Sequence, residues 1–289
     1  YQPYVAGHNN ILLTLKNLKL LDKKGYKVIY IPFLSGPPLN EAIVSGKIDF
    51  GFAGDLPTIS LLASGARVKI IAVNNKSLRQ AIVVNSKRED IKDIEDLKNK
   101  KIALVKGSSS HYFLSKTLKE KGIDPKEINL IHTDVTNQPL ALFSNQVDAI
   151  VSWEPWPTKL ERKGIGKILN AGKYNGYIFV REEVIEKNLQ KVFDFIESLQ
   201  KALEFTQRNF TQSCLWVAEE TKENPEIICQ AAKTDKIFQQ GETIQITEDL
   251  IAELENGAQF LFNEGFIFQI PNFKEKIDSS FIEKILKEK

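Results

Sequence analysis

The chain has 289 residues, of which 42% are hydrophobic and 26% charged, and this composition excludes a disordered or collagen-like chain. Lys and Arg number 39 and Asp and Glu 37, so the net charge of +2 lacks the basic excess of a dedicated nucleic-acid binder. No apolar run in the sequence approaches the roughly 18 residues of a membrane span. The length predicts about two domains.

The first 75 residues alternate short apolar runs with helical patterns. Strands are predicted at 27–33, 48–53 and 68–73, with helices at 37–45 and 57–63 between them. Pro37 in the first helical turn and Gly46 after the last are typical of helix ends. This order of strand and helix predicts a parallel sheet with right-handed crossovers.

The same rhythm restarts after Lys76 and continues to about residue 180. The predicted strands are 81–84, 101–105, 128–132, 147–151, 167–170 and 177–180, and the helices between them are 93–97, 111–121 and 139–144. From Glu182 the pattern is helical, at 184–190, 192–209, 214–221, 226–234 and 248–264, with a solvated helix face at 281–289. The sequence therefore predicts two α/β units followed by a helical tail.

Ligands of open parallel sheets bind beyond the carboxyl ends of the strands, so the residues that follow each strand are candidates for a site. The most chemically specific of them are Gly107-Ser108-Ser109-Ser110, which stand between a predicted strand and a predicted helix. Backbone N–H groups and three hydroxyls at the positive end of a helix dipole predict an anion site. The alternative is that Ser108 or Ser109 simply caps the helix.

Two further strand ends, and the residue after the three serines, carry candidate side chains. Trp153 would supply an apolar wall and Glu154 would accept a hydrogen bond or balance a cation, although core packing and a turn at Pro155 explain them equally well. Asp55 is either a ligand contact or a helix N-cap. His111 faces either the site or the helix surface. Arg79 and Lys106 are the nearest cations to these loops.

Catalytic patterns are missing from the sequence. It contains no Gly-x-Ser-x-Gly elbow, no His-Glu-x-x-His and no evident nucleophile with its base. Cys214 and Cys229 lack metal-ligand spacing and are expected to be two inert thiols on helices, with a disulfide as the alternative. The sequence thus favours binding over catalysis and predicts neither a metal nor a cofactor.

At these same residues the chain resembles the substrate-binding proteins of ABC importers for aliphatic sulfonates and taurine, within the nitrate, sulfonate and thiamin-precursor group. The resemblance covers about residues 1–180, and its ordered set of blocks is more specific than any one of them. The blocks are Tyr1-Gln2-Pro3, Phe33 to Leu39, Gly46 to Gly51, Gly54 to Pro57, Asp96 to Ala103, Gly107 to His111, Val147 to Ala149 and Trp153 to Pro155.

The resemblance implies a type II periplasmic-binding-protein fold, in which two three-layer α/β lobes close on a ligand and perform no catalysis. It implies the ligand-binding residues Gln2, Ser35, Gly36, Asp55, Gly107, Ser108, Ser109, His111, Trp153 and Glu154. Lobe one would comprise residues 1–80 and 178–289, and lobe two residues 81–177, with a hinge near Ala81 and Tyr177.

The ligand implied first is a small organic anion, most simply an aliphatic sulfonate or taurine. Alternatives are a thiamin-pyrimidine-like heterocycle, nitrate or bicarbonate, a sensor domain fused to signalling modules, and an enzyme built on the same fold. The expected partner is an ABC-transporter permease, and the expected state is a monomer outside the cytoplasmic membrane. An export signal and any lipid-anchor cysteine would lie upstream of Tyr1.

Overall fold

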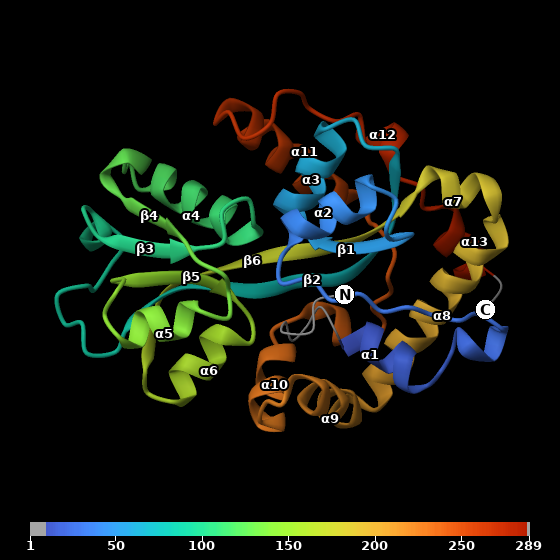
Figure 1. Cartoon of the computed structure of the whole chain (residues 1–289), viewed down its shortest axis with the longest axis horizontal. Coiled ribbons are helices and arrows are strands. Elements are labelled where there is room, and N and C mark those ends of the chain that lie inside the picture. Colours follow the sequence, from blue (N-terminus) through green and yellow to red (C-terminus); the bar gives the residue numbers. More distant parts are fainter. Residues whose placement is uncertain (1–9, 288–289) are drawn as a thin grey trace.

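The computed structural model describes residues 10–287, and in this part of the chain helices cover both faces of one mixed sheet (Figure 1). The sheet has six strands in the order β1-β6-β2-β5-β3-β4. Their bounds are β1 Phe50–Gly54, β2 Val68–Asn85, β3 Lys101–Leu104, β4 Asn129–His132, β5 Ala149–Trp153 and β6 Gly166–Arg181. The predicted α/β class is confirmed.

The helices also follow the predicted alternation. Their bounds are α1 Asn10–Asn17, α2 Gly36–Val44, α3 Asp55–Ala63, α4 Ser109–Glu120, α5 Gln138–Phe143, α6 Trp156–Arg162, α7 Glu182–Lys187, α8 Leu189–Arg208, α9 Phe210–Thr221, α10 Pro225–Ala232, α11 Glu248–Asn263, α12 Phe273–Lys276 and α13 Ser280–Lys287. The described chain also contains short 3-10 turns, at 22–24, 95–97, 125–127 and 236–238.

Two long antiparallel strands form the centre of the sheet. β2 has 18 residues and β6 has 16, and they pair from Val68 opposite Arg181 to Asn85 opposite Gly166. The sequence predicted two short strands in each place, because polar residues interrupt the apolar runs. In the structure these residues continue the strand, and the pairing register shifts between Val73 and Leu78. The two strands form a ribbon that runs through both halves of the molecule (Figure 1).

The sheet is mixed, so the predicted parallel sheet is wrong for its first part. β1 and the first half of β2 both pair antiparallel with β6, which lies between them. Parallel pairing occurs where β3 lies between β4 and β5. The difference arises because β6 returns from the far half of the molecule and inserts between strands that are neighbours in sequence.

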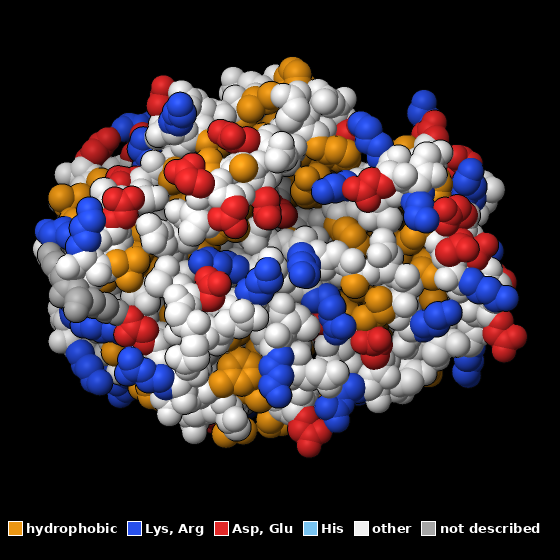
Figure 2. Space-filling model, turned by 180° about the vertical axis from the view of Figure 1, so that it is seen from behind, with side chains coloured by type: hydrophobic (Ala, Val, Ile, Leu, Met, Phe, Trp, Pro, Cys, Tyr) orange, Lys and Arg blue, Asp and Glu red, His pale blue; other side chains and the backbone are white. Residues whose placement is uncertain are grey.

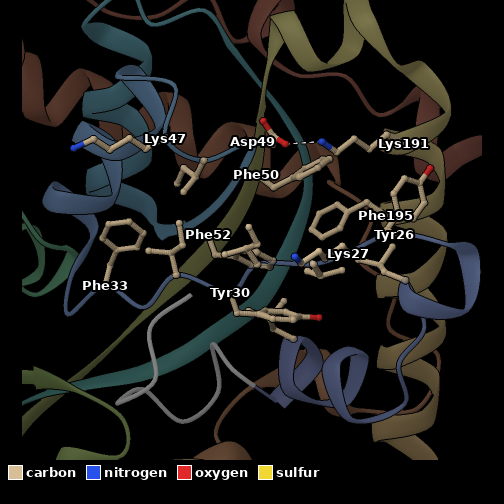
Figure 3. Close-up of a pocket in the computed structure, with 16 residues that line it drawn as sticks. Tyr26, Lys27, Tyr30, Phe33, Lys47, Asp49, Phe50, Phe52, Lys191 and Phe195 are labelled. Atoms are coloured by element: carbon tan, nitrogen blue, oxygen red, sulfur yellow. Dashed lines mark hydrogen bonds and ion pairs between the residues drawn. The ribbon is translucent and has the colours of Figure 1, made fainter.

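The strand predicted at 27–33 is not formed. A cavity of about 350 Å³ separates residues 26–33 from residues 47–52, and aromatic rings line it, including Phe50 stacked on Phe195 at 4.1 Å between centroids (Figure 3). A strand needs a hydrogen-bonded neighbour. Within residues 10–287 neither this segment nor the outer edge of β1 has one.

The buried side chains separate into clusters that follow the two halves of the chain. The largest cluster draws on residues 11–73 and 177–285. Two further clusters draw on residues 81–160 alone. Acidic and basic side chains are intermixed over the back of the molecule (Figure 2), and among the described helices none is long and apolar enough to cross a bilayer.

Candidate functional site

The carboxyl ends of β1 and β5 point toward each other along the central ribbon. β1 ends at Gly54 opposite Gly176 of β6, and β5 ends at Trp153 opposite Gln80 of β2, which itself pairs with Gly172. Positions 172 and 176 are about 13 Å apart along a strand, at roughly 3.3 Å per residue. The loops after the two strands therefore face one another over the middle of the ribbon, and we call this region the strand-end site.

Parallel pairing brings a third loop to the same place. β3 lies beside β5, so residues that follow β3 emerge at the same edge of the sheet as Trp153. A buried cluster lies at this edge and contains residues from both strands of the ribbon, β2 and β6, and from β5. Its members are Leu78, Val105, Val135, Trp153 and Tyr174, with Trp156 packed against them. The strand-end site thus has an apolar floor that contains two indole rings.

The serine loop begins α4, and its hydroxyls are arranged differently from a simple cap. Ser108 occupies the N-cap position, but its hydroxyl donates 2.7 Å back to the carbonyl of Val105 instead of accepting from the helix. The Ser109 hydroxyl is buried and has no well-formed hydrogen bond to the described residues. Ser110 donates to the side chain of Gln80 at 3.4 Å. The alternative of a simple side-chain cap is therefore wrong for this helix end, and the Ser109 hydroxyl lies beside the Asp55 carboxyl.

His111 stabilises this loop as a neutral ring. Its Nδ1 accepts a hydrogen bond of 3.3 Å from the backbone N–H of Gly107, whose φ of +78° favours glycine. Burial lowers the pKa of His111 to about 4, with a smaller contribution from Lys106. The ring therefore carries no charge at neutral pH and does not act as a cationic partner for an anion.

The loops from the two halves are in direct contact. A Cβ atom placed on Gly54 would lie 2.3 Å from the Ser109 hydroxyl and 3.2 Å from the Tyr174 ring. A Cβ on Gly107 would lie 3.4 Å from the side chain of Pro37, just after the buried Ser35 and Gly36. The absence of a side chain at Gly54 is what lets β1 approach α4 this closely.

Asp55 starts α3 at this contact. The residue is half-buried, and its carboxylate accepts 3.0 Å from the backbone N–H of Leu56. Loss of water around the carboxyl raises its pKa to about 6, and the neighbouring Ser109 hydroxyl offsets part of this rise. Asp55 therefore changes charge near pH 6, next to the Ser109 hydroxyl.

Glu154 already has a cationic partner in the structure. It is fully buried, forms an ion pair with Arg79, and accepts 3.2 Å from the backbone N–H of Thr158. Burial raises the pKa of Glu154, and the charge of Arg79 opposes that rise. Arg79 also donates 2.8 Å to the Thr158 hydroxyl. Both charges thus hold the turn between β5 and α6, and the nearest arginine is not a free anion ligand.

Sequence reasoning missed several polar groups at this site. The indole N–H groups of Trp153 and Trp156 and the Ser152 hydroxyl are buried without a hydrogen-bond partner in the described chain. Unpaired buried donors are costly and rare, and each requires an explanation. The position of Trp156 two residues after Glu154 was visible in the sequence, but nothing there indicated an unpaired donor.

Most of the predicted residues lie together, at the ends of β1, β3 and β5 and at the start of α2. Gln2 lies outside the described residues. None of the residues that line the cavity of Figure 3 is among those predicted. Across residues 10–287 the structure has no group of three or more His, Cys, Asp and Glu side chains suited to a metal ion.

The sequence of this chain is similar to those of several known proteins. A model of the family described as "NMT1/THI5 like" matches residues 24–212. The "Putative aliphatic sulfonates-binding protein" of Bacillus subtilis (strain 168) is 28% identical over 92% of this chain and 81% of the relative. The "Taurine-binding periplasmic protein" of Escherichia coli (strain K12) is 23% identical over 90% of this chain and 85% of its own.

A solved structure extends the comparison to the fold. The alkanesulfonate-binding protein SsuA from Xanthomonas axonopodis pv. citri, bound to MOPS, superposes with a TM-score of 0.85. It is 23% identical, and the match covers 97% of this chain and 96% of that one. This likeness confirms the predicted periplasmic-binding-protein fold.

Proposed function

The chain belongs to the NMT1/THI5-like family, and from this premise we propose that it is a solute-binding protein that captures a small organic anion for an ABC importer. Relatives over most of its length are named as binding proteins for aliphatic sulfonates and taurine. The proposed ligand is therefore an aliphatic sulfonate or a taurine-like compound. The protein binds and releases this ligand without a chemical step.

The observation that carries the proposal is the set of unpaired buried donors at the strand-end site. The indole N–H groups of Trp153 and Trp156 lie on or beside one cluster and have no hydrogen-bond partner among residues 10–287. The buried Ser109 hydroxyl lies beside the Asp55 carboxyl and makes no well-formed hydrogen bond to the described residues. An indole N–H can only donate, so its natural partner is an acceptor such as a sulfonate oxygen. The N-terminus of α4 adds backbone donors and a favourable dipole for the same charge.

The organic part of the ligand would lie against the indole rings, and an amine would meet Asp55. Glu154 does not take that role, because Arg79 already neutralises it. We therefore assign Glu154 and Arg79 to positioning the Trp153 turn. Ser35, Gly36 and Gly107 would contribute backbone at the contact between the loops, with His111 as the support of Gly107.

The proposed lobes are residues 1–80 with 178–289, and residues 81–177. The separate buried clusters support this division, and the irregular register of β2 between Val73 and Leu78 supports a hinge within the ribbon. Contacts between the halves resemble a closed form: His111 meets Phe266 at 4.8 Å, and Arg162 of α6 pairs with Glu226 of α10 at 2.8 Å. A ligand held by both lobes would select this form.

The test is calorimetry and thermal shift on protein that has been unfolded and refolded to remove any carried ligand. The panel contains taurine, alkanesulfonates, nitrate, bicarbonate and pyrimidine precursors. A sulfonate present at 100 times its Kd should add about 2.7 kcal/mol to the free energy of unfolding. Failure of every anion to bind would refute the proposal.

A pair of serine variants tests the site itself. Ser109→Ala should weaken sulfonate binding about tenfold, because a hydrogen bond to a charged group contributes roughly 1.5–3 kcal/mol. Ser115→Ala, further along the same helix and also buried, is the matched control and should leave the affinity unchanged. Equal effects of the two substitutions would show that the Ser109 hydroxyl does not contact the ligand.

A heterocyclic cation of the thiamin-precursor type is the second candidate. The observation that favours it is Asp55, a half-buried carboxyl close to the rings of Tyr112 and Tyr174. Stabilisation by pyrimidine precursors, with indifference to competing sulfonates, would select this candidate.

The partner in transport would be an ABC permease, and the protein would work outside the cytoplasmic membrane. Two relatives named as periplasmic, one of them as part of an ABC transporter, support this proposal. We also propose that it works as a monomer, held at the membrane by at most a lipid anchor. Mass photometry and fractionation of the native host would test these points.

A further inference from the structure

Two thiols meet in the helical hairpin beneath the sheet. α9 and α10 are joined by residues 222–224, and Asn224 caps α10 by accepting 2.8 Å from the N–H of Glu226. Cys214 of α9 is fully buried in a cluster with Val217 and Ile228. Cys229 of α10 packs against that same cluster and is half-buried. Both are free thiols in this structure.

We propose that Cys214 and Cys229 form an intramolecular disulfide that joins α9 to α10. The oxidant is a protein or small-molecule disulfide, as an oxidising compartment supplies, and the presence of this oxidant in the cell rests on the proposed extracytoplasmic location. The capacity to form the bond depends only on the hairpin and is independent of the ligand.

The chemistry balances as two successive exchanges. The Cys229 thiolate, which is the more exposed, attacks the oxidant's disulfide and releases one thiolate. The Cys214 thiolate then attacks the Cys229 sulfur and releases the second. The protein loses two protons and two electrons, and the oxidant becomes two thiols. Burial raises the pKa of Cys214, and the adjacent Cys229 thiol raises it further, so the first attack falls to the more exposed Cys229.

The bond would stabilise the contact between α6 and the hairpin. Glu223, in the turn, pairs with Lys159 of α6, and Glu226 pairs with Arg162 at 2.8 Å. The two cysteines are about 15 residues apart, a spacing for which closing the loop in the unfolded chain gives a substantial entropic stabilisation. The disulfide therefore holds the two acidic residues in the position from which they reach α6.

The experiment uses the purified full chain with and without oxidised glutathione. After quenching with iodoacetamide under denaturing conditions, the oxidised protein should carry no label and should have lost two hydrogen atoms in mass. Cleavage after Arg208, Lys222 and Lys233 places the cysteines in separate tryptic peptides, 209–222 and 223–233. Without reduction these peptides should appear as one cross-linked species. The oxidised form should melt higher, by on the order of 5 °C.

Cys214→Ala is the control, because it leaves Cys229 free to form a mixed disulfide with glutathione but no internal bond. The oxidant should then leave the melting temperature of this variant almost unchanged. Cys229→Ser is a second control, because Cys229 is the less buried cysteine and its replacement should disturb folding less. It keeps the test valid if Cys214→Ala fails to fold. Full alkylation of both thiols after oxidation, a purely intermolecular bond, or no rise in the melting temperature would each overturn the proposal.

Discussion

Trp153 and Trp156 provide the strand-end site with hydrogen-bond donors, because each indole N–H is buried without an acceptor in residues 10–287. Trp153→Phe removes the N–H and keeps an aromatic ring. We expect this variant to bind a sulfonate about tenfold more weakly, since a hydrogen bond to a charged group contributes roughly 1.5–3 kcal/mol. Isothermal calorimetry on the refolded protein measures the change.

The matched control for this substitution is Trp216→Phe. Trp216 lies on α9, where its ring stacks on Phe205 at 5.6 Å between centroids, away from the strand ends. The substitution Trp216→Phe should therefore leave the affinity for the sulfonate unaltered. If both variants bind equally well, the indole N–H of Trp153 does not hold the ligand.

We expect Asp55 to make ligand binding depend on pH. Its pKa of about 6 means that the side chain is mostly neutral at pH 5 and mostly charged at pH 7. An alkanesulfonate without an amine should therefore bind more weakly as the pH rises across this range, because the two negative charges repel. Taurine should lose less affinity, since its ammonium group would pair with the charged carboxylate. Calorimetry at both pH values measures the difference.

Asp55→Asn isolates this carboxyl. The variant has the same size and no charge, so the affinity for an alkanesulfonate should be flat between pH 5 and pH 7. A pH dependence that persists in the variant would assign the titration to another group.

Among the elements, α6 contacts the turn between α9 and α10 and the first residues of α10, and this contact links the two halves of the chain. Lys159 and Glu223 are the less exposed pair there, with side chains 23% and 16% exposed. Glu223→Gln should lower ligand affinity two- to fivefold, because ion pairs of this kind contribute about 0.5–1 kcal/mol and, in the proposed closure, this one would form only when the halves meet. Isothermal calorimetry detects the change.

Lys187 and Glu183 provide the comparison for that pair. They form an i,i+4 contact within α7, so Glu183→Gln removes a carboxylate from an ion pair that does not cross between the halves. An equal loss of affinity in both variants would mean that the Glu223 pair has no specific part in closure.

The elements were predictable where periodicity and caps agreed. Helices such as α3 and α4 follow short apolar strands and start at turn residues, and the structure confirms them. The continuity of β2 was not predictable, because Asn74 and Asn75 look like a break although they are buried in the ladder. The tail at 281–289 was interpreted as a solvated face, yet Phe281 and Ile285 are buried by packing that involves distant parts of the chain.

The candidate site was predictable to the extent that it follows strand ends. Gly107 to His111, Asp55 and Trp153 were identified by this rule, and the structure brings their loops together. The ion pair of Arg79 with Glu154 was not, since it joins strands 75 residues apart in sequence. Which polar group is left unpaired depends on every neighbour in three dimensions, so no local pattern reveals it.

For the whole molecule, the proposed closure would be limited by the contact between the end of β1 and the start of α4. Gly54 has a φ of −71°, which any residue can adopt, so the requirement for glycine there is one of space. A side chain at this position would enter the region of Ser109 and the Tyr174 ring. The contact at Gly54 is thus a steric limit on the approach of the two halves.

Gly54→Val should therefore hold the halves apart. We expect the variant to fold, because its backbone is unstrained, and to bind the ligand at least tenfold more weakly, because its side chain blocks the form that both loops contact. Small-angle scattering should show the wild-type radius of gyration falling on addition of ligand and that of the variant staying constant. Ala53, the preceding residue on β1, is fully buried, and Ala53→Gly serves as a control that perturbs the strand without adding bulk. Compaction of Gly54→Val by the ligand would mean that the halves close without this contact.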